Sequence, residues 1–527
     1  MKKFYIVAAV LALVGAGIFS FSGCKPKTAP SSSGEIKSAE KNSFNEVTSK
    51  LDAGGNFYLY LSTEQWLNNL SSKVGNWHQL ISSLPDVQNQ QQDIDKAFNV
   101  VTQLVKDSGL EQISGVGMSS IAREPGFYRN KLIVHHYSGQ GNGFIWNIFG
   151  KEPHELTGLD LLPTNTAMAA FYDLDAPQVW AIIEKECEQS GFPQAKDGLD
   201  RFRREFAQGT HMKWEDAVGS LDGEFGIVVT LDTSHMITIP LPTPEPFDIP
   251  EPGFMLVAKV KNDAIFNAID AQLSKNVQQQ LIRDDKNGVK MRTVQVPIPL
   301  ISLRPSIAAS GGYLFIATTD ALIREALAVK GGKPGLKSTD EFKRLAEGLP
   351  QRGNQFCFLS SSFGQTISKI QQQALEMHKD SSSPQVKQLM QSLINPNGAA
   401  FTFAVGANTD EGWMTVANGN QGSGTVMAAS AAAVPGILAG IAIPNFIKGR
   451  NTAQKNTCIN NLRIIDGAKQ QWAIDNHKKP SDVPAWQDIQ PYLGKSKGPP
   501  HCPKGGEYTI GAVDQPPTCS IPEHVLP

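Results

Sequence analysis

Six cysteines and ten histidines are the side chains of this sequence best suited to metal binding or nucleophilic chemistry. One group near the C-terminus has the residue types of a zinc site: His477, His501, Cys502, Cys519 and His524. Zinc sites usually include two ligands a few residues apart, but the only close pair here is the adjacent His501-Cys502. We therefore predict no metal site and no bound cofactor, and this group remains the alternative.

Other motifs with catalytic residue types lack the context that catalysis requires. Gly139–Gly143 reads GxGxG and has no ribose-binding acid after it, so a loop is favoured over a dinucleotide site. Gly331–Thr339 follows an expected helix where a phosphate loop needs a strand. His135 and His136 alternate on an expected strand and point to opposite faces. Ser360–Ser362 lacks a GxSxG elbow and is interpreted as a helix cap. We predict no catalytic residues.

The composition limits the class of protein that could carry these residues. The 527-residue chain has 48 Lys+Arg against 50 Asp+Glu, 19% charged residues and 40% apolar residues. This is too much core material for a disordered chain and too little net charge for a nucleic-acid-binding protein. The length corresponds to about three to four globular units.

The N-terminus has the pattern of an export signal. Met1–Lys3 is basic, Phe4–Phe21 is uncharged and apolar, and Phe21-Ser22-Gly23 precedes Cys24. This resembles the lipobox of bacterial lipoproteins, which implies a signal peptide over 1–23 and a diacylglycerol on the Cys24 thiol. An ordinary signal peptide with an incidental cysteine is the alternative. The polar segment 24–43 is interpreted as a flexible tether, and Lys25 after the cysteine favours the outer membrane.

Between residues 44 and 422 the chain repeats one order of elements. Alternating apolar stretches at 56–62, 166–172, 254–258 and 355–359 each precede an amphipathic run and then paired alternating segments. This order predicts an α+β fold with repeated strand-helix-hairpin units, antiparallel sheets and helices on one face. Six prolines between Pro240 and Pro252 predict an extended connector that divides the body into halves, 44–245 and 246–422.

The last hundred residues form a different module. Gly436–Lys448, Ala453–Arg463 and Gly506–Gly511, with Cys502 and Cys519, resemble type IV pilins and the pseudopilins of type II secretion. The resemblance covers about one fifth of the chain and implies a pilin-like domain over 423–527, with a long helix and a small sheet. The family's glutamate falls at Met427, so the resemblance implies docking to a pilus or secretion system rather than ordinary filament assembly.

Thr425–Ile443 is a run of 19 uncharged residues within this module. It is long enough to span a bilayer, but it contains only six Val, Ile or Leu residues, and Pro435 opposes insertion. We favour a helix packed on protein or lying on a membrane surface, and a spanning helix is the alternative.

The cysteines divide by expected role. Cys502 and Cys519 bracket the expected terminal strands, and closing this loop of about 16 residues would contribute about 3 kcal/mol in the entropic model. Pseudopilin-like C-terminal loops are pinned in a comparable way, so we predict a Cys502–Cys519 disulfide. Cys187, Cys357 and Cys458 are expected to be buried core thiols.

These features together predict a cell-envelope lipoprotein that is not an enzyme. It would be anchored by lipidated Cys24 on the periplasmic side and act as a binding or structural module. Envelope or secretion-system proteins are the expected partners, and nucleic acid is not. An extracytoplasmic hydrolase with a site assembled from distant residues is the alternative.

Overall fold

A computed structural model describes residues 42–83, 91–239, 247–295, 303–377, 399–423, 455, 457–493, 499–503, 505–521 and 524–526. The chain divides into two compact units, Met1–Met427 and Ala428–Pro527. The expected signal peptide, Cys24, most of the tether and the apolar run 425–443 lie outside the described residues. Among the helices that are described, none is both long and apolar enough to cross a bilayer.

The repeated order of strand, helix and hairpin is confirmed in the first unit. Gly126 (φ +73°) and Gly412 (φ +104°) occupy two of the expected turns, where only glycine adopts the left-handed backbone without strain. The first half contains α2 (Phe44–Thr48), β1 (Phe57–Ser62), α3 (Glu64–Leu67), α4 (Leu70–Ser82), α5 (Gln91–Ser108), β2 (Gly115–Glu124), β3 (Phe127–His135), β4 (His154–Glu155), η4 (Thr157–Leu161), β5 (Thr166–Asp173), α6 (Ala176–Gln189), α7 (Pro193–Thr210), α8 (Trp214–Gly219) and β6 (Leu221–Ile239).

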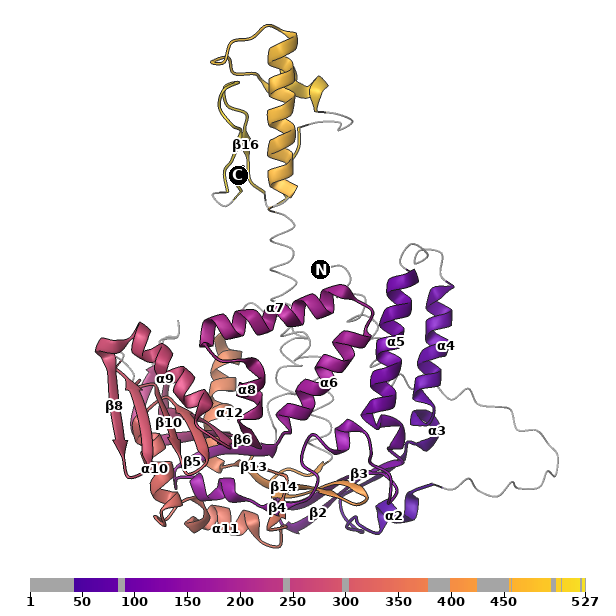
Figure 1. The fold of residues 1–527 in the computed structure, drawn as a ribbon, viewed down its shortest axis with the longest axis vertical. Coiled ribbons are helices and arrows are strands. Elements are labelled where there is room, and N and C mark those ends of the chain that lie inside the picture. Colours follow the sequence, from indigo (N-terminus) through magenta and orange to yellow (C-terminus); the bar gives the residue numbers. More distant parts are fainter. Residues whose placement is uncertain are drawn as a thin grey trace, which may run out of the picture. The chain divides into compact units, whose positions relative to one another are not determined.

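The second half continues the same order (Figure 1). It contains β7 (Phe247–Val260), α9 (Ala264–Asn276), β8 (Leu281–Lys286), β9 (Val289–Val294), β10 (Ser306–Ser310), β11 (Tyr313–Ala317), α10 (Asp320–Lys330), α11 (Asp340–Ala346), β12 (Arg352–Gly353), β13 (Gln355–Leu359), α12 (Ser361–Met377), β14 (Thr402–Thr409) and β15 (Gly412–Gly419).

Within the described residues, 13 of these strands form one antiparallel sheet. Its order is β1-β2-β3-β15-β14-β13-β5-β6-β7-β11-β10-β9-β8. Strands β13–β15 from the second half lie between β3 and β5 from the first. The α+β class is therefore as predicted, and the two expected halves share a single sheet.

The proline-rich segment is a correction to the sequence analysis. Its last two prolines lie within β7 of the long β6–β7 hairpin, where Pro250 pairs with Met236 and Pro252 with Leu231. β7 pairs with β11 only over Met255–Lys259. Its proline-containing end therefore pairs with β6 on one side alone within the described residues. Proline is tolerated there because a strand with one neighbour needs only half of its backbone donors.

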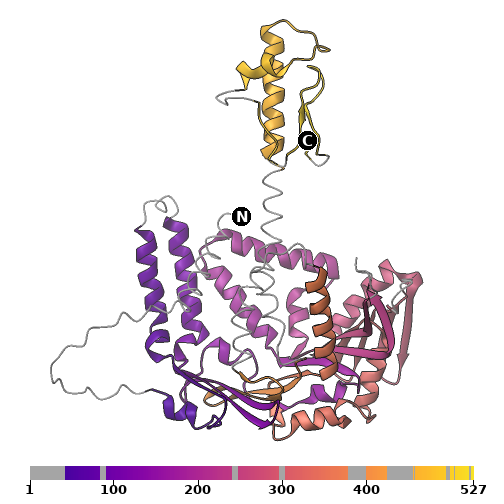
Figure 2. The same cartoon turned by 180° about the vertical axis from the view of Figure 1, so that it is seen from behind.

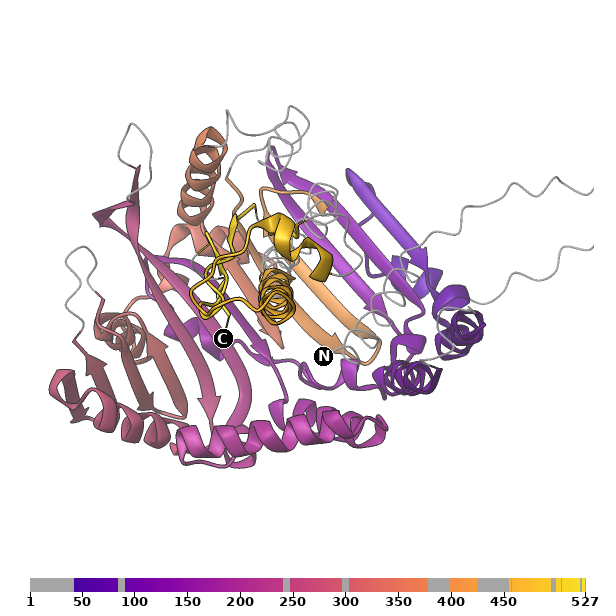
Figure 3. The same cartoon turned by 90° about the horizontal axis from the view of Figure 1, so that it is seen from above.

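The main core lies between the sheet and α10, α11 and η4, which Figures 1 and 2 show below the sheet. Aromatic side chains from neighbouring strands dominate it: Phe171 and Phe356 stack with centroids 5.0 Å apart, and Phe342 of α11 lies 4.8 Å from Phe403. On the other side of the sheet α9 packs on β10 and β11 through Phe266, α6–α8 lie beside it, and Figure 3 shows α7 along the border of the sheet.

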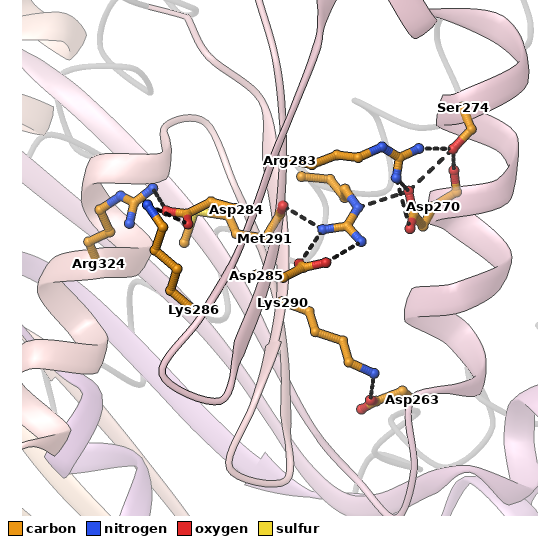
Figure 4. Close-up of polar contacts among 11 residues, drawn as sticks. Asp263, Asp270, Ser274, Arg283, Asp284, Asp285, Lys286, Lys290, Met291 and Arg324 are labelled. Carbon is orange, nitrogen blue, oxygen red and sulfur yellow. Dashed lines mark hydrogen bonds and ion pairs between the residues drawn. The ribbon is translucent and has the colours of Figure 1, made fainter.

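An ion-pair network joins α9 to the last hairpin of the sheet (Figure 4). The guanidinium of Arg292 in β9 is 7% exposed and bonds Asp285 at 2.5 and 3.1 Å, while its Nε lies 2.9 Å from Asp270 of α9. Arg283 also donates to Asp270, at 3.0 Å. The planar fork of arginine matches two carboxylates at once, so this network sets the position of α9 on the sheet edge.

The second unit consists of a long helix over 457–475, α15 (Trp486–Ile489), η7 (Gln490–Tyr492) and, in its described part, a sheet of β16 (Tyr508–Thr509) and β17 (Thr518–Cys519). Cys458, Leu462, Ile465 and Trp472 fall at helical spacing in the sequence, which predicts one apolar face for this helix, and all four side chains are buried. Lys469 on this helix is fully buried, and its ammonium donates to the carbonyl oxygens of Ile510 (3.3 Å) and Gln515. The lysine thereby ties the 510–515 loop to the helix.

We expect the Phe358→Ala substitution to lower the free energy of unfolding of the first unit by about 3–5 kcal/mol, because Phe358 is fully buried in the main core. Phe254→Ala is the matched control: it removes the same ring from the same sheet at a position 51% exposed, so we expect a loss below about 1 kcal/mol. Urea unfolding followed by near-ultraviolet circular dichroism measures both. Equal losses of unfolding free energy in the two variants would contradict the assignment of Phe358 to the main core.

Candidate functional site

The sequence-predicted site residues do not form a common site. Cys24 lies outside the described residues. Cys502 and Cys519 lie close together in the second unit, with their sulfur atoms within 4.8 Å of each other, and the disulfide between them stays a prediction. The Cys502 sulfur also lies 3.5 Å from Nδ1 of His524. The two cysteines lie near Cys458 and His524 in the second unit. Together these four residues have a geometry that could bind a metal ion.

The motifs judged non-catalytic from the sequence have structural roles. His135 and His136 are both buried; His135 bonds the hydroxyl of Ser114 at 2.6 Å, and the His136 ring packs on Trp146. Ser360 accepts a hydrogen bond from the backbone N–H of Phe363 at 3.1 Å, which is the expected cap. These hydrogen bonds and ring contacts stabilise the local structure around each group.

The first unit contains a polar cleft of about 380 Å³ at one border of its sheet. It lies where β5 runs into α6, β6 begins and β7 ends. Asp173 and Glu224 are cross-strand partners in the β5–β6 pairing, which puts two carboxyl groups beside each other. The remaining lining residues include Asn147, Gly150, Lys151, His154, Asp175, Asp222, Lys259 and Lys261.

His154 and Asp173 form the central pair of the cleft. Nε2 of His154 lies 2.9 and 3.0 Å from the two oxygens of Asp173, and its Nδ1 lies 2.8 Å from the carbonyl oxygen of Glu155. Both neighbours are acceptors, so both ring nitrogens donate when the ring is an imidazolium. The hydrogen bond to Asp173 accordingly raises the pKa of His154 above its usual value. Asn354 donates to Asp173 at 3.0 Å and completes the carboxylate's environment.

Glu224 is the most buried carboxyl group of the cleft, with 6% of the residue exposed. The hydroxyl of Thr157 donates to it at 3.1 Å and that of Tyr313 at 3.4 Å. Burial raises the pKa of Glu224 above its usual range, because removing water disfavours the charged form. Its oxygens are thus oriented by two hydroxyl groups from outside β6.

This arrangement can supply charge and hydrogen bonds to a polar ligand. Lys151 and Lys261 are exposed at the cleft, and Lys259 is half-buried within it. A carboxyl group with a raised pKa beside a histidine with a raised pKa is also a starting point for acid–base chemistry. Sequence reasoning missed this site because its residues come from separate elements and form no motif. The Asp173-Leu174-Asp175 turn after a strand was the only local signal.

The comparisons with known proteins place this cleft inside a recognisable region. Residues 147–405 match a family described as "Protein of unknown function (DUF3352)". The match spans just under half of the chain and contains every residue that lines the cleft. Neither the curated proteins nor the solved structures gave a match. The family description assigns no activity, so function rests on the residues themselves.

We expect Asp173→Asn to lower the pKa of His154, because it removes the charge that stabilises the imidazolium. The folded-state pKa of His154 is raised, so its pairing with Asp173 stabilises the fold fully below the unfolded value of about 6.5 and is lost as pH rises through the folded pKa. Titration of the His154 ring by NMR measures the shift. Asp175→Asn, in the same cleft, serves as control and should leave the His154 titration nearly unchanged.

Proposed function

We propose that this protein is a cell-envelope lipoprotein whose α+β body is a non-enzymatic binding module. Its ligand would be a protein or a surface polymer held at the polar cleft. The C-terminal pilin-like domain would be an interaction domain that docks on an envelope or secretion-system protein. Lipidated Cys24 would hold the protein on the periplasmic side, with the outer membrane favoured.

The observation that carries the binding proposal is the way the cleft's reactive groups are held. His154 bonds protein acceptors through both ring nitrogens, and Glu224 accepts from two protein hydroxyls. Groups held in this way make a rigid surface, which lowers the entropy cost of recognition. The lysines at the cleft supply the charges that a ligand would meet first.

The envelope location is supported by the sequence. The Met1–Lys3 charges, the apolar run and Cys24 follow the order of a lipoprotein signal. The second unit is compatible with the pilin resemblance in its general form, a long helix with a small sheet. Met427 in place of the family's glutamate favours docking over filament assembly.

A hydrolase is the second candidate, and one observation favours it. Glu224 combines burial, a raised pKa and a place beside the His154–Asp173 pair. Such a carboxyl group can act as a general acid.

We expect the mature chain, immobilised, to capture a defined partner from envelope extracts, and Lys259→Glu with Lys261→Glu to reduce that capture at least 10-fold. Reversing both charges changes the potential of the cleft without removing its core. A matched control, Lys286→Glu with Lys343→Glu, makes the same change of net charge at two exposed positions outside the cleft and should capture normally. Capture that the cleft variant leaves unchanged would contradict the proposal. Hydrolysis of p-nitrophenyl esters or glycosides, lost in Glu224→Gln, would favour the hydrolase.

We also expect Cys24→Ala to release the protein from the membrane pellet into the soluble fraction after alkaline carbonate extraction, because it removes the lipidated thiol. Cys357→Ser should stay in the pellet as the unmodified chain does. If Cys24→Ala stayed in the pellet, a second membrane attachment such as a spanning 425–443 segment would replace the lipid anchor as the explanation.

A further inference from the structure

Four potential ligand atoms converge at one end of the second unit. They belong to Cys458, Cys502, Cys519 and His524, and all lie within 4.8 Å of one another. Three of these residues are buried and Cys519 is half-buried. Together they supply three sulfurs and one imidazole nitrogen.

Each ligand reaches the cluster from a different segment. Cys458 lies in the first turns of the 457–475 helix, and Cys502 lies before a turn in which the N–H of Gly505 donates to its carbonyl oxygen at 2.9 Å. Cys519 ends β17, paired with Tyr508. The N–H of His524 donates to the carbonyl oxygen of Ile521 at 2.9 Å, which turns the chain back toward the sulfurs.

We propose that Cys458, Cys502, Cys519 and His524 bind one Zn²⁺ ion as a structural Cys₃His site. Three thiolates and an imidazole are a donor set that selects zinc over oxygen-preferring cations such as Mg²⁺ and Ca²⁺. This assignment replaces the sequence expectation that the chain binds no metal. It does not depend on the binding function proposed for the α+β body.

The distances fit tetrahedral coordination. With Zn–S near 2.3 Å and Zn–N near 2.0–2.1 Å, ligand sulfurs lie about 3.8 Å apart and a sulfur lies about 3.6 Å from a nitrogen. Sγ of Cys502 is 3.5 Å from Nδ1 of His524, already at the value for a shared ion. The largest separation in the cluster, at most 4.8 Å, closes to this geometry with movements below about 1 Å.

Neighbouring groups orient the ligands as a second layer. The hydroxyl of Tyr508 donates to Sγ of Cys458 at 3.3 Å, and the amide of Asn461 donates to that hydroxyl at 3.2 Å. The same amide donates to the carbonyl oxygen of His501 at 3.1 Å and so fixes the backbone that enters Cys502. Donors to thiolates moderate the net negative charge of three sulfurs around a dication.

A close approach explains the glycine in this loop. A Cβ on Gly506 would lie 2.7 Å from Sγ of Cys519, so only glycine lets the loop pass the ligand.

The site is closed and structural rather than catalytic. All four tetrahedral positions are filled by protein ligands, and no position remains for water or substrate. The second unit also needs such a link, because its strands are two residues long and its described core is small. Small modules with little apolar core commonly depend on a metal or a disulfide.

A zinc site and a Cys502–Cys519 disulfide predict different results when Cys458 is replaced. In a zinc site Cys458 is a ligand, whereas in a disulfide it is a bystander. The test uses the full mature chain purified under reducing conditions without chelator, with zinc measured by inductively coupled plasma mass spectrometry. We expect one Zn²⁺ per chain and at least a 10-fold loss of zinc affinity in Cys458→Ser, measured by competition with a chromogenic chelator.

The control variants are Cys187→Ser and Cys357→Ser, which remove thiols of the first unit and should retain one zinc. Replacement of Zn²⁺ by Co²⁺ should give thiolate-to-cobalt charge transfer and the visible bands of tetrahedral cobalt. His524→Cys keeps four ligands, so it should retain the metal and shift the cobalt bands toward a four-sulfur site, even if the serine variant does not fold.

Three outcomes would overturn the proposal. The first is a mature chain that holds no zinc and gives no tetrahedral cobalt spectrum. The second is zinc binding that Cys458→Ser leaves unchanged. The third is a Cys502–Cys519 disulfide found by mass spectrometry in the protein as isolated from cells.

Discussion

Backbone pairing of β13 with both β5 and β14 holds the first unit together. β13 brings residues 355–359 between strands that begin almost 240 residues apart, so it joins the early and late parts of the chain in one sheet. Its inward side chains, Phe356 and Phe358, then meet Phe171 of β5 and Phe403 of β14. Interior density requires these rings to fit one another, and the position of β13 makes that contact.

The polar cleft depends on the same pairing. Asp173 ends β5, and the amide of Asn354, just before β13, donates to it. Asn354 in turn accepts a hydrogen bond from the backbone N–H of Asn408 in β14 at 2.8 Å. The cleft's carboxylate is therefore positioned by three strands, and a rigid site on strands holds its groups more precisely than one on loops.

The second unit is held together by a different kind of interaction. Its strands are too short to contribute much apolar burial, so buried polar contacts carry more of the organisation. Lys469 bonds two loop carbonyls from inside the core, and the cysteine and histidine cluster gathers the helix, the hairpin and the C-terminal turn. Both interactions fix loops that apolar packing alone would leave underdetermined, since directional contacts specify geometry more strictly than hydrophobic burial does.

Local patterns in the sequence were enough to predict the α+β class, the repeated strand-helix-hairpin order and the buried stripe from Cys458 to Trp472, because periodicity depends on which face of an element is buried. Sequence reasoning could not predict the insertion of β13–β15 between β3 and β5 or the pairing of Pro250. These follow from strand partners far away in the chain.

Sequence reasoning also could not predict the cleft or the cysteine cluster. Loop length and the pseudopilin resemblance suggested that Cys502 and Cys519 form a pair, and helical spacing suggested that Cys458 is a core residue. Only the packing of the helix beside β17 and the turn before His524 brought all four ligand atoms together. The amino-acid types therefore determined what chemistry this chain has available, and the tertiary structure decided which residues share it, because proximity between distant segments is set by packing rather than by spacing.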